Sequence, residues 1–423
     1  MAGKTFVGFG FGPIQSALFL FEAYQSGNFS RYVVAEIDAN LVHAVRDNGG
    51  AYTINIARKG RIDQVTVRGV ELYDPHNAAE RATIVDAIAQ ADEMATALPS
   101  VRFFDSGDAS VAKTLAAGLA VRQGQRPGVI YAAENHNHAA EILTEAIAKY
   151  TPVPASVQIL NTVIGKMSGV IGEADVIERL GLATMTPKTP KAILVEEFNR
   201  ILISRISLSG FERGIDVFVE QDDLYPFEEA KLYGHNAIHA LIGYLGDLRG
   251  LSTMAQAAEH PDIMETARRA FIDESGGALV HKYARLNDPL FTAAGYREYA
   301  EDLLDRMVRP NLNDLVARVT RDPIRKLGYD DRLFGTMRLA IREGITPASL
   351  ARGAGAAVIC LINRREGVES LNVEVSESVD RLTEPELAGI LQATWGQKHD
   401  AEARELVALT WQAVLALRTG QRA

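Results

Sequence analysis

The stretch that decides the fold opens the chain: TFVGFGFGP at residues 5–13, then a helical stretch at 14–25 and YVVAE at 32–36. A β-rich run, a glycine-rich turn, a helix and a second β-rich run ending in an acidic residue follow one another as in a dinucleotide-binding βαβ unit. Glycines have no Cβ, so the backbone can approach a pyrophosphate, and the next helix offers its N–H groups to the anion. These residues therefore predict a Rossmann-like domain.

The glycine motif itself is incomplete. In one frame Gly8 and Gly10 are followed by Pro13 where the motif has its third glycine, and in the other frame Gly10 and Gly12 are followed by Gln15. We expect Gly8, Gly10 and Gly12 to contact the cofactor. An ordinary strand-to-helix turn would carry the same glycines and stays open as the alternative.

Glu36 predicts which dinucleotide binds. It follows the glycine turn at close to the ~20-residue spacing at which an acidic residue accepts a hydrogen bond from the ribose 2′-hydroxyl. A carboxylate here repels a 2′-phosphate, and residues 37–40 contain no arginine to offset that repulsion. NAD is therefore favoured over NADP. The alternative is a solvated carboxylate at the end of a strand.

The first half of the chain alternates β-rich and helical stretches, which is typical of a parallel sheet covered by helices. Expected strands lie at residues 5–8, 32–36, 52–57, 101–104, 129–133 and 157–163. Expected helices lie at residues 13–25, 79–97, 109–122 and 138–150. We predict a doubly wound α/β domain over residues 1–190.

Beyond residue 228 the periodicity is almost entirely helical. Apolar residues recur every three and four positions at 228–245, 261–283, 295–307, 332–342, 347–363, 385–392 and 401–417. We predict a mainly α-helical domain over residues 191–423. The sequence leaves open whether the helices of residues 380–423 pack on this domain or on a partner.

Composition limits the class of protein. The 44 Lys and Arg residues against 54 Asp and Glu give a net charge of −10, which provides no basic field for nucleic acid. Cys360 is the single cysteine, as expected in a reducing compartment. No apolar run reaches the ~18 residues of a membrane span. We expect a cytoplasmic protein that binds a small molecule, and the oligomeric state stays open.

Polar residues follow the expected strand at 129–133. Ligands of an open α/β sheet bind beyond the carboxyl ends of its strands, so Asn135 is placed to polarise a substrate carbonyl in the cofactor crevice. The alternative is that Asn135 or Asn137 caps the helix that begins near His138, because asparagine is a preferred N-cap residue.

The helix expected at residues 228–245 carries polar residues where a surface helix would not. At about 100° per residue, Ile238, Ile242 and Leu245 lie within about 40° of Lys231. Asn236 and His239 lie along one flank of this apolar stripe. Burial lowers the pKa of a lysine, which turns its amine into a usable general base.

Three roles are needed for alcohol dehydrogenation by a nicotinamide cofactor. A base takes the hydroxyl proton while a hydride leaves the same carbon, an amide stabilises the developing alkoxide and an imidazole orients the oxygen. Lys231, Asn236 and His239 fit these roles in that order. The alternative is that Lys231 extends to solvent and His239 is a core histidine.

The run KLYGHNAIHALIGYL at residues 231–245 resembles the active-site helix of the polyol-specific long-chain dehydrogenases, the mannitol dehydrogenase family. Within this family the pattern is most similar to that of the mannitol-1-phosphate 5-dehydrogenases. Further stretches are similar to the family as well: VEEF at 195–198, RPNLND at 309–314, VTRDPIRKL at 319–327 and DRL at 331–333.

The resemblance implies an NAD-linked, metal-independent dehydrogenase with a Rossmann-like N-terminal domain and a helical C-terminal domain. It implies that Lys231 is the general base, that Asn236 and His239 handle the substrate oxygen, and that Asn135 completes the oxyanion site. Pro13 and Arg309 depart from the family pattern, so the substrate can differ from mannitol 1-phosphate while the reaction is retained.

Arg325, Lys326 and Arg332 form a basic cluster that suits a phosphate or carboxylate on the substrate. The alternative is a solvated helix end whose charges pair with neighbouring aspartates. The leading hypothesis is a dehydrogenase that interconverts a secondary alcohol of a polyol, or of its phosphate, with the ketose. Reduction of a keto-uronate, of the tagaturonate or fructuronate type, and nucleotide binding without turnover are the competing hypotheses.

Overall fold

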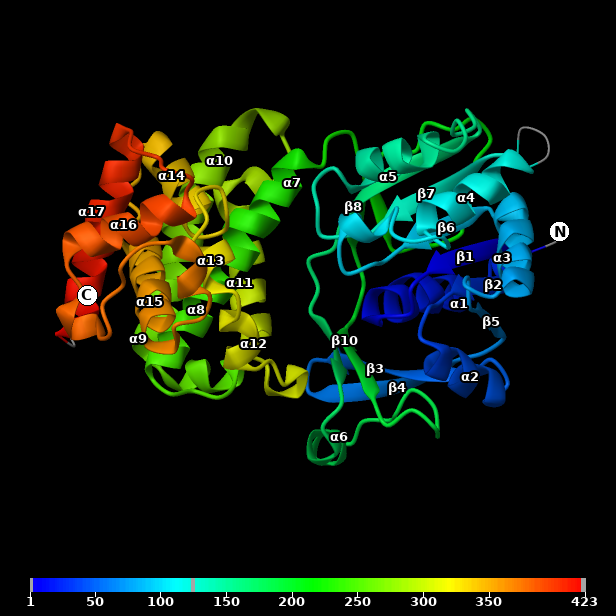
Figure 1. The fold of residues 1–423 in the computed structure, drawn as a ribbon, viewed down its shortest axis with the longest axis horizontal. Coiled ribbons are helices and arrows are strands. Elements are labelled where there is room, and N and C mark those ends of the chain that lie inside the picture. Colours follow the sequence, from blue (N-terminus) through cyan, green and yellow to red (C-terminus); the bar gives the residue numbers. More distant parts are fainter. Residues whose placement is uncertain (1–2, 123–125, 420–423) are drawn as a thin grey trace. The chain divides into compact units, whose positions relative to one another are not determined.

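The computed structural model describes residues 3–122 and 126–419, and the chain divides into two units between Tyr225 and Pro226 (Figure 1). The main sheet of the N-terminal unit consists, in order across the sheet, of β12 (Phe218–Gln221), β11 (Ile201–Ser204), β8 (Val157–Val163), β7 (Gly128–Ala132), β6 (Glu93–Thr96), β1 (Lys4–Phe9), β2 (Phe29–Ala35) and β5 (Val70–Tyr73). All neighbours from β8 to β5 run parallel, and β11 pairs with β8 antiparallel. The α/β prediction is thus confirmed.

The sheet is buried on both faces because its strands alternate apolar residues between two cores. In β1, Val7 and Phe9 join the core under helices on one face, whereas Phe6 joins the core on the other face. The helices of the first face are α3 (Ala78–Gln90), α4 (Val111–Ala120) and α5 (Ala139–Ala148). The second face is covered by the π-helical segment η1 (Gln15–Leu20), which continues as α1 (Phe21–Ser26), and by a second sheet.

The second sheet contains, in order, β4 (Arg61–Val67), β3 (Tyr52–Arg58), β10 (Ala192–Glu196) and β9 (Ser168–Ile171). Along the chain, α6 (Ala174–Leu180) lies between β9 and β10, and α2 (Ala39–Asp47) precedes β3 and packs against β5 of the main sheet. The strand expected at residues 52–57 therefore exists, but it pairs with β10 and β4 rather than with the main sheet.

Two local predictions were wrong. Residues 101–104 form no strand, since Val101–Phe103 is the short 3₁₀ turn η2, and the strand beside β1 is β6, inside the helix expected at 79–97. All four residues of β6 are buried, so the strand shows no alternation. Its polar residue Glu93 is buried because it accepts a hydrogen bond of 2.9 Å from the Tyr131 hydroxyl.

The division between the units differs from the expected one at residue 190. Strand β10 pairs with β3, and β11 pairs with β8 and β12, so residues 191–225 complete both sheets of the N-terminal unit. Such pairing partners are far away in sequence. Local periodicity therefore did not indicate where the α/β unit ends.

The C-terminal unit is helical, as predicted (Figure 1). Its α-helices are α7 (Tyr225–Glu229), α8 (Ala237–Leu248), α9 (Pro261–Arg269), α10 (Gly277–Tyr283), α11 (Ala293–Met307), α12 (Val316–Thr320), α13 (Pro323–Lys326), α14 (Phe334–Arg342), α15 (Ala348–Arg364), α16 (Glu384–Thr394) and α17 (Ala401–Arg418). Two π-helical segments, η3 (Ala230–Asn236) and η5 (Ala270–Gly276), are continuous with α-helices. Short 3₁₀ turns occupy Met254–Glu259, Ala284–Leu286, Pro289–Phe291, Pro310–Leu312, Val368–Leu371 and Val379–Arg381. Among the described residues, every helix is too short or too polar to cross a membrane.

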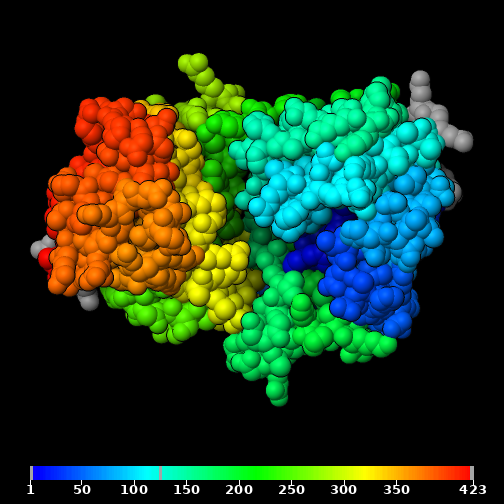
Figure 2. Space-filling view, in the orientation of Figure 1, coloured from blue at the N-terminus to red at the C-terminus, as the bar shows by residue number. Residues whose placement is uncertain are grey.

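The C-terminal helices pack on their own unit. The Trp395 indole N–H donates to the carbonyl oxygen of Leu327 at 2.8 Å, and the Glu402 carboxylate accepts from Arg338 and Arg342 of α14 at 2.8 and 2.7 Å. Figure 2 shows the atoms of this segment, coloured orange to red, gathered in one continuous region of the surface. The described part of residues 380–423 is therefore integral to the helical unit.

Candidate active site

The glycine-rich turn joins the carboxyl end of β1 to η1. Gly10 has a φ of +83°, a conformation that favours glycine, and its N–H donates to the Ala35 carbonyl oxygen at 2.9 Å. A Cβ on Gly10 would lie 3.1 Å from the Ala97 carbonyl oxygen, whereas the space beside Gly12 is open to 4 Å. The turn thus lies between the ends of β1, β2 and β6, where an open α/β sheet binds its ligand.

Gln15 explains why the glycine motif is incomplete. Its side chain is fully buried, and a Cβ on Gly8 would lie 2.2 Å from the Gln15 amide nitrogen. The Gln15 side chain thus fits against the strand because Gly8 has no side chain. Packing against Gln15 accounts for Gly8, and contact between Gly8 and a cofactor stays a prediction.

Glu36 follows the carboxyl end of β2. Its N–H donates to the Tyr73 carbonyl oxygen at 3.0 Å, and its Oε1 accepts from the Asp38 N–H at 2.8 Å. The carboxylate is half-buried and is held by its own turn beside the glycine-rich segment. This placement suits the ribose contact that the sequence predicts.

Asn135 lies just beyond β7, on the exposed end of the strand. Its neighbour Glu134 is buried and ties this end to that of β6, accepting from the Thr96 hydroxyl at 3.0 Å and the Leu98 N–H at 2.8 Å. Burial raises the pKa of Glu134 to about 7, although these donors favour the carboxylate. Sequence reasoning assigned Glu134 no role of its own.

The alternative in which Asn137 caps the next helix is wrong. Helix α5 begins at Ala139, and the preceding residue, His138, makes no side-chain cap. Instead Asn161, at the end of β8, accepts from the Ala140 N–H at 2.8 Å. The cap comes from a neighbouring strand, which no local pattern indicates.

The helix with the predicted catalytic residues is not a uniform α-helix. Lys231 and Asn236 both lie in the π-helical segment η3, which is continuous with α8. The angles between side chains that the sequence predicts for a uniform α-helix, at 100° per residue, are therefore wrong for this stretch. In a π turn the hydrogen bond runs from residue i to i+5, so five residues make little more than one turn, and Lys231 and Asn236 lie closer in angle than they would in an α-helix. In an α-helix they would be about 140° apart.

Lys231 is only partly exposed. Burial lowers the pKa of its amine from 10.5 to about 8, the charge of Glu228 opposes this shift and the charge of Arg332 adds to it. A lysine with a pKa of about 8 is neutral in about a tenth of the molecules at pH 7 and in about half of them at pH 8. The expected direction of the pKa shift is thus found, and the role of Lys231 as base stays a proposal.

His239 is held by a carboxylate from elsewhere in the helical unit. Its Nε2 lies 2.7 Å from Asp314 Oδ2, and the other oxygen of Asp314 accepts from Arg318 at 2.7 Å. Burial acts to raise the pKa of Asp314, but the hydrogen bond to His239 and the nearby positive charge hold it below its ordinary value. A carboxylate can only accept, so Nε2 carries a proton, and in the neutral form of the ring Nδ1 is then the acceptor.

His235 is a second histidine of this helix that sequence reasoning did not single out. It is buried, and its ring lies 6.2 Å from that of His239. Burial, together with the neighbouring His239 and Arg306, holds its pKa well below the ordinary value. The Nδ1 of His235 has no hydrogen-bond partner in the parts of the chain that the structure describes. His235 is thus a neutral core residue beside the site.

The basic cluster is divided by the structure. Lys326 is buried and its amine donates to the carbonyl oxygens of Val319, at 2.5 Å, and Arg321, so it caps α12. Arg325 is exposed and pairs with aspartates. Arg332 pairs with the adjacent Asp331 at 2.8 Å, and its charge lowers the pKa of Lys231. Of the three, Arg332 is the one whose charge acts on Lys231.

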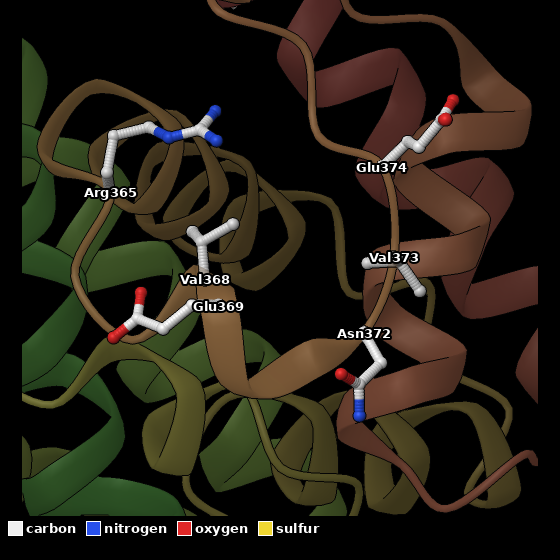
Figure 3. Close-up of a pocket in the computed structure, with 6 residues that line it drawn as sticks. All are labelled: Arg365, Val368, Glu369, Asn372, Val373 and Glu374. Carbon is white, nitrogen blue, oxygen red and sulfur yellow. The ribbon is translucent and has the colours of Figure 1, made fainter.

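A surface pocket of about 380 Å³ lies in the segment after α15 (Figure 3). It is lined by Arg365, Val368, Glu369, Asn372, Val373 and Glu374. None of them is a predicted site residue. Within residues 3–122 and 126–419, no three His, Cys, Asp or Glu side chains come together as a metal-binding group.

The comparison with known proteins begins with the helical unit. Residues 223–406 match the family described as "Mannitol dehydrogenase C-terminal domain". Over 334 residues the chain is 32% identical to the mannitol-1-phosphate 5-dehydrogenase of Anoxybacillus flavithermus. The matched residues cover 78% of this chain and 82% of that protein. The chain belongs to the mannitol dehydrogenase family.

Further similar proteins agree with the chain in sequence or in fold. The mannitol-1-phosphate 5-dehydrogenase of Bacillus licheniformis is 28% identical over 89% of this chain and 91% of its own length. Mannitol 2-dehydrogenase of Pseudomonas fluorescens, solved with NAD and D-mannitol, is 14% identical with a TM-score of 0.69 over 99% of this chain and 92% of that one. A D-sorbitol dehydrogenase has 13% identity and a TM-score of 0.76 over 99% and 94%. The two structures show the shared fold.

Proposed function

We propose that this member of the family is an NAD-dependent polyol phosphate dehydrogenase. It interconverts a secondary alcohol of a polyol phosphate similar to mannitol 1-phosphate with the corresponding ketose phosphate. The observation that carries the proposal is the arrangement on one helix of Lys231, with its lowered pKa, of Asn236 in the same π-helical segment, and of His239 bonded to Asp314. The names of the similar curated relatives support the same reaction.

In the oxidation, the neutral amine of Lys231 takes the hydroxyl proton. The amide of Asn236 donates to the substrate oxygen as negative charge develops on it, and Asn135 is the proposed second donor. The Nδ1 of His239, an acceptor because Nε2 is bonded to Asp314, orients a substrate hydroxyl. In the reduction, protonated Lys231 returns the proton to the oxygen.

The residues of the N-terminal unit fit NAD. The positive φ of Gly10 and the open space beside Gly12 let a pyrophosphate approach the backbone, and Glu36 suits a ribose 2′-hydroxyl. NAD supplies the acceptor for the hydride when it is bound. The carboxylate of Glu36 disfavours the 2′-phosphate of NADP.

We assign recognition of the substrate phosphate to Arg332, with Arg325 as a second contact. Lys326 is less suitable, because its amine already donates to two backbone carbonyls. A guanidinium provides several donors in a geometry that matches phosphate oxygens. The pairing of Arg332 with Asp331 then orients the side chain.

The proposed location is the cytoplasm. Cys360 is the only cysteine in the sequence, and it is buried with its thiol donating to Asp247 at 2.9 Å. A chain of this length without a disulfide framework is typical of a reducing compartment. Fractionation of cells that express the natural protein tests this assignment.

The proposal is tested by following nicotinamide absorbance with purified protein and a panel of polyols, polyol phosphates and keto-uronates. We expect turnover of a polyol phosphate with NAD, and a lower kcat/KM for the same polyol without phosphate. Preferred turnover of a keto-uronate would replace the proposed substrate class. No turnover with either NAD or NADP, while NAD still binds, would leave a nucleotide-binding protein without catalysis.

Lys231→Ala tests the role of the lysine. We expect kcat to fall by about 10²-fold or more, since a general base contributes about that much, while the Kd for NAD stays unchanged. Lys398→Ala is the matched control, because Lys398 is exposed and lies in the same unit. A kcat within twofold of the unsubstituted protein would remove Lys231 as the base.

A further inference from the structure

The π-helical segment that carries Lys231 is held by side chains from outside its own helix. The Tyr233 carbonyl oxygen, in the middle of η3, accepts from the Ser275 hydroxyl at 2.9 Å and from the Thr336 hydroxyl at 3.2 Å. Both hydroxyl-bearing residues are fully buried. A buried carbonyl needs a hydrogen-bond partner, and two hydroxyls meet this need for Tyr233.

The two hydroxyls are not equivalent. Thr336 also lies against the Arg332 carbonyl oxygen one turn earlier in its helix, so its single proton is shared between two acceptors. Ser275 has a further partner, the Tyr296 hydroxyl at 3.2 Å. If Tyr296 donates to Ser275, then Ser275 donates to Tyr233, and such a chain strengthens each of its bonds. Ser275 is therefore the principal donor.

Close packing brings these donors within reach. A Cβ on Gly234 would lie 2.6 Å from the Tyr296 hydroxyl oxygen and 2.9 Å from the Phe271 ring. A Cβ on Gly335, next to Thr336, would lie 2.6 Å from the ring of Tyr233. Glycine at positions 234 and 335 thus allows Phe271 of η5 and helix α14 to approach η3 closely.

We infer that Ser275 and Thr336 are positioning residues that hold the π turn, and that this turn directs the Lys231 amine and the Asn236 amide to one substrate oxygen. In an α-helical turn the two groups would diverge by about 140°. The spacing of five residues between base and amide is thus useful only while the helix keeps its i to i+5 turn. This inference rests on the proposed function for its chemistry, but not for its structure.

The first test is the crystal structure of the Ser275→Ala, Thr336→Val double variant of the full chain. We expect η3 to lose its i to i+5 hydrogen bonding and the distance between the Lys231 amine and the Asn236 amide to increase. A double variant that keeps the π turn unchanged would overturn the inference. This result does not depend on turnover, so the inference is decided even if no polyol phosphate is a substrate.

The second test is kinetic and uses the single variants. We expect Ser275→Ala to lower kcat about tenfold to a hundredfold, as misplacement of a catalytic group by about 1 Å does. We also expect a shift in the apparent pKa that Lys231 contributes to the pH profile of kcat/KM. The Kd for NAD should not change. Ser275→Thr, which keeps the hydroxyl, should restore most of kcat and the original pH profile.

Thr410→Val is the matched control. Thr410 is fully buried in the same unit, and its hydroxyl donates to a helix carbonyl, that of Leu406, at 2.7 Å. A loss of kcat in Thr410→Val equal to that in Ser275→Ala would overturn the positioning role, because it would show a general effect of losing a buried hydroxyl. If the unsubstituted protein itself turned over no member of the panel, the proposed function would fail separately.

Discussion

At the scale of single residues, burial and one carboxylate set the properties of two polar side chains in the helical unit, the pKa of Lys231 and the tautomer of His239. Burial is the main cause of the lowered pKa of Lys231, and Glu228 keeps that pKa from falling further. The buried carboxylate of Asp314 selects the tautomer of His239. Different contacts thus set the properties of Lys231, the proposed base, and of His239, the proposed orienting group.

The pH dependence of catalysis follows from the pKa of Lys231, about 8. Oxidation needs the neutral amine, so kcat/KM should rise with pH and level off above about 8. Reduction needs the protonated amine, so its rate should fall as the pH rises through the same value. Initial rates in both directions between pH 6 and 10 check this, and profiles of the same sign in both directions would contradict it.

Asp314→Asn should lower kcat by about tenfold or more, as loss of orientation does. An asparagine amide can donate to Nε2, which would move the ring proton to Nδ1 and remove the acceptor there. Initial-rate kinetics, with the Kd for NAD as the measure of an intact N-terminal unit, check this. The control is Asp262→Asn, because Asp262 also pairs with an arginine, Arg249, at 2.6 Å. Equal kcat values for the two variants would contradict the role of Asp314.

At the scale of elements, the turn after β1 is shaped for close approach. Its helix begins at Pro13 and becomes π-helical at Gln15, and the Ser16 hydroxyl donates to the Gly12 carbonyl oxygen at 2.8 Å. The positive φ of Gly10 reverses the chain at the carboxyl edge of the sheet. The turn and the first residues of η1 thus form one element with a single task, which we propose is binding of the pyrophosphate.

Gly10→Ala should weaken NAD binding. The φ of +83° strains an alanine by about 1 kcal/mol, and its Cβ would press on the Ala97 carbonyl oxygen at 3.1 Å. Gly27→Ala is the matched control, since Gly27 has a φ of +69° but open space around it. Both variants should lose stability in urea unfolding, Gly10→Ala the more because of its additional contact, and only Gly10→Ala should raise the Kd for NAD. An equal Kd for the two would contradict the role of this turn.

At the scale of the whole molecule, stability of the helical unit depends on its C-terminal helices. Burial acts to raise the pKa of Glu402, but hydrogen bonds from Arg342, Arg338 and Tyr329 lower it to about 2, from an ordinary value of 4.5. A carboxyl group whose pKa is lowered by folding stabilises the protein above its unfolded pKa. This stabilisation is lost as the pH falls from about 4.5 through about 2.

Glu402→Gln should therefore reduce the free energy of unfolding at pH 7 by about 1–2 kcal/mol, after allowance for solvent screening. The difference from the unsubstituted protein should shrink as the pH falls toward 2, because both side chains are then neutral. Chemical unfolding of the full chain at pH 7 and pH 3, followed by circular dichroism, checks this. A difference that is the same at both values would contradict the ion-pair explanation.

The sequence by itself determined the elements whose signals are local. The alternation of β-rich and helical stretches, the turn at Gly10 and the triad Lys231, Asn236 and His239 are all contained in short windows. Hydrophobic periodicity and motif spacing indicate such features because the residues involved are neighbours along the chain. These features were enough for the fold class and for the family resemblance.

Only the tertiary structure decided what depends on distant residues. Asp314 reaches His239 from 75 positions away, and Ser275 and Thr336 reach Tyr233 from η5 and α14. Pairing across sheets placed residues 191–225 in the N-terminal unit. A buried carboxylate or carbonyl must find its partner in space, and the geometry of that partner is set by packing of the whole unit rather than by spacing along the chain.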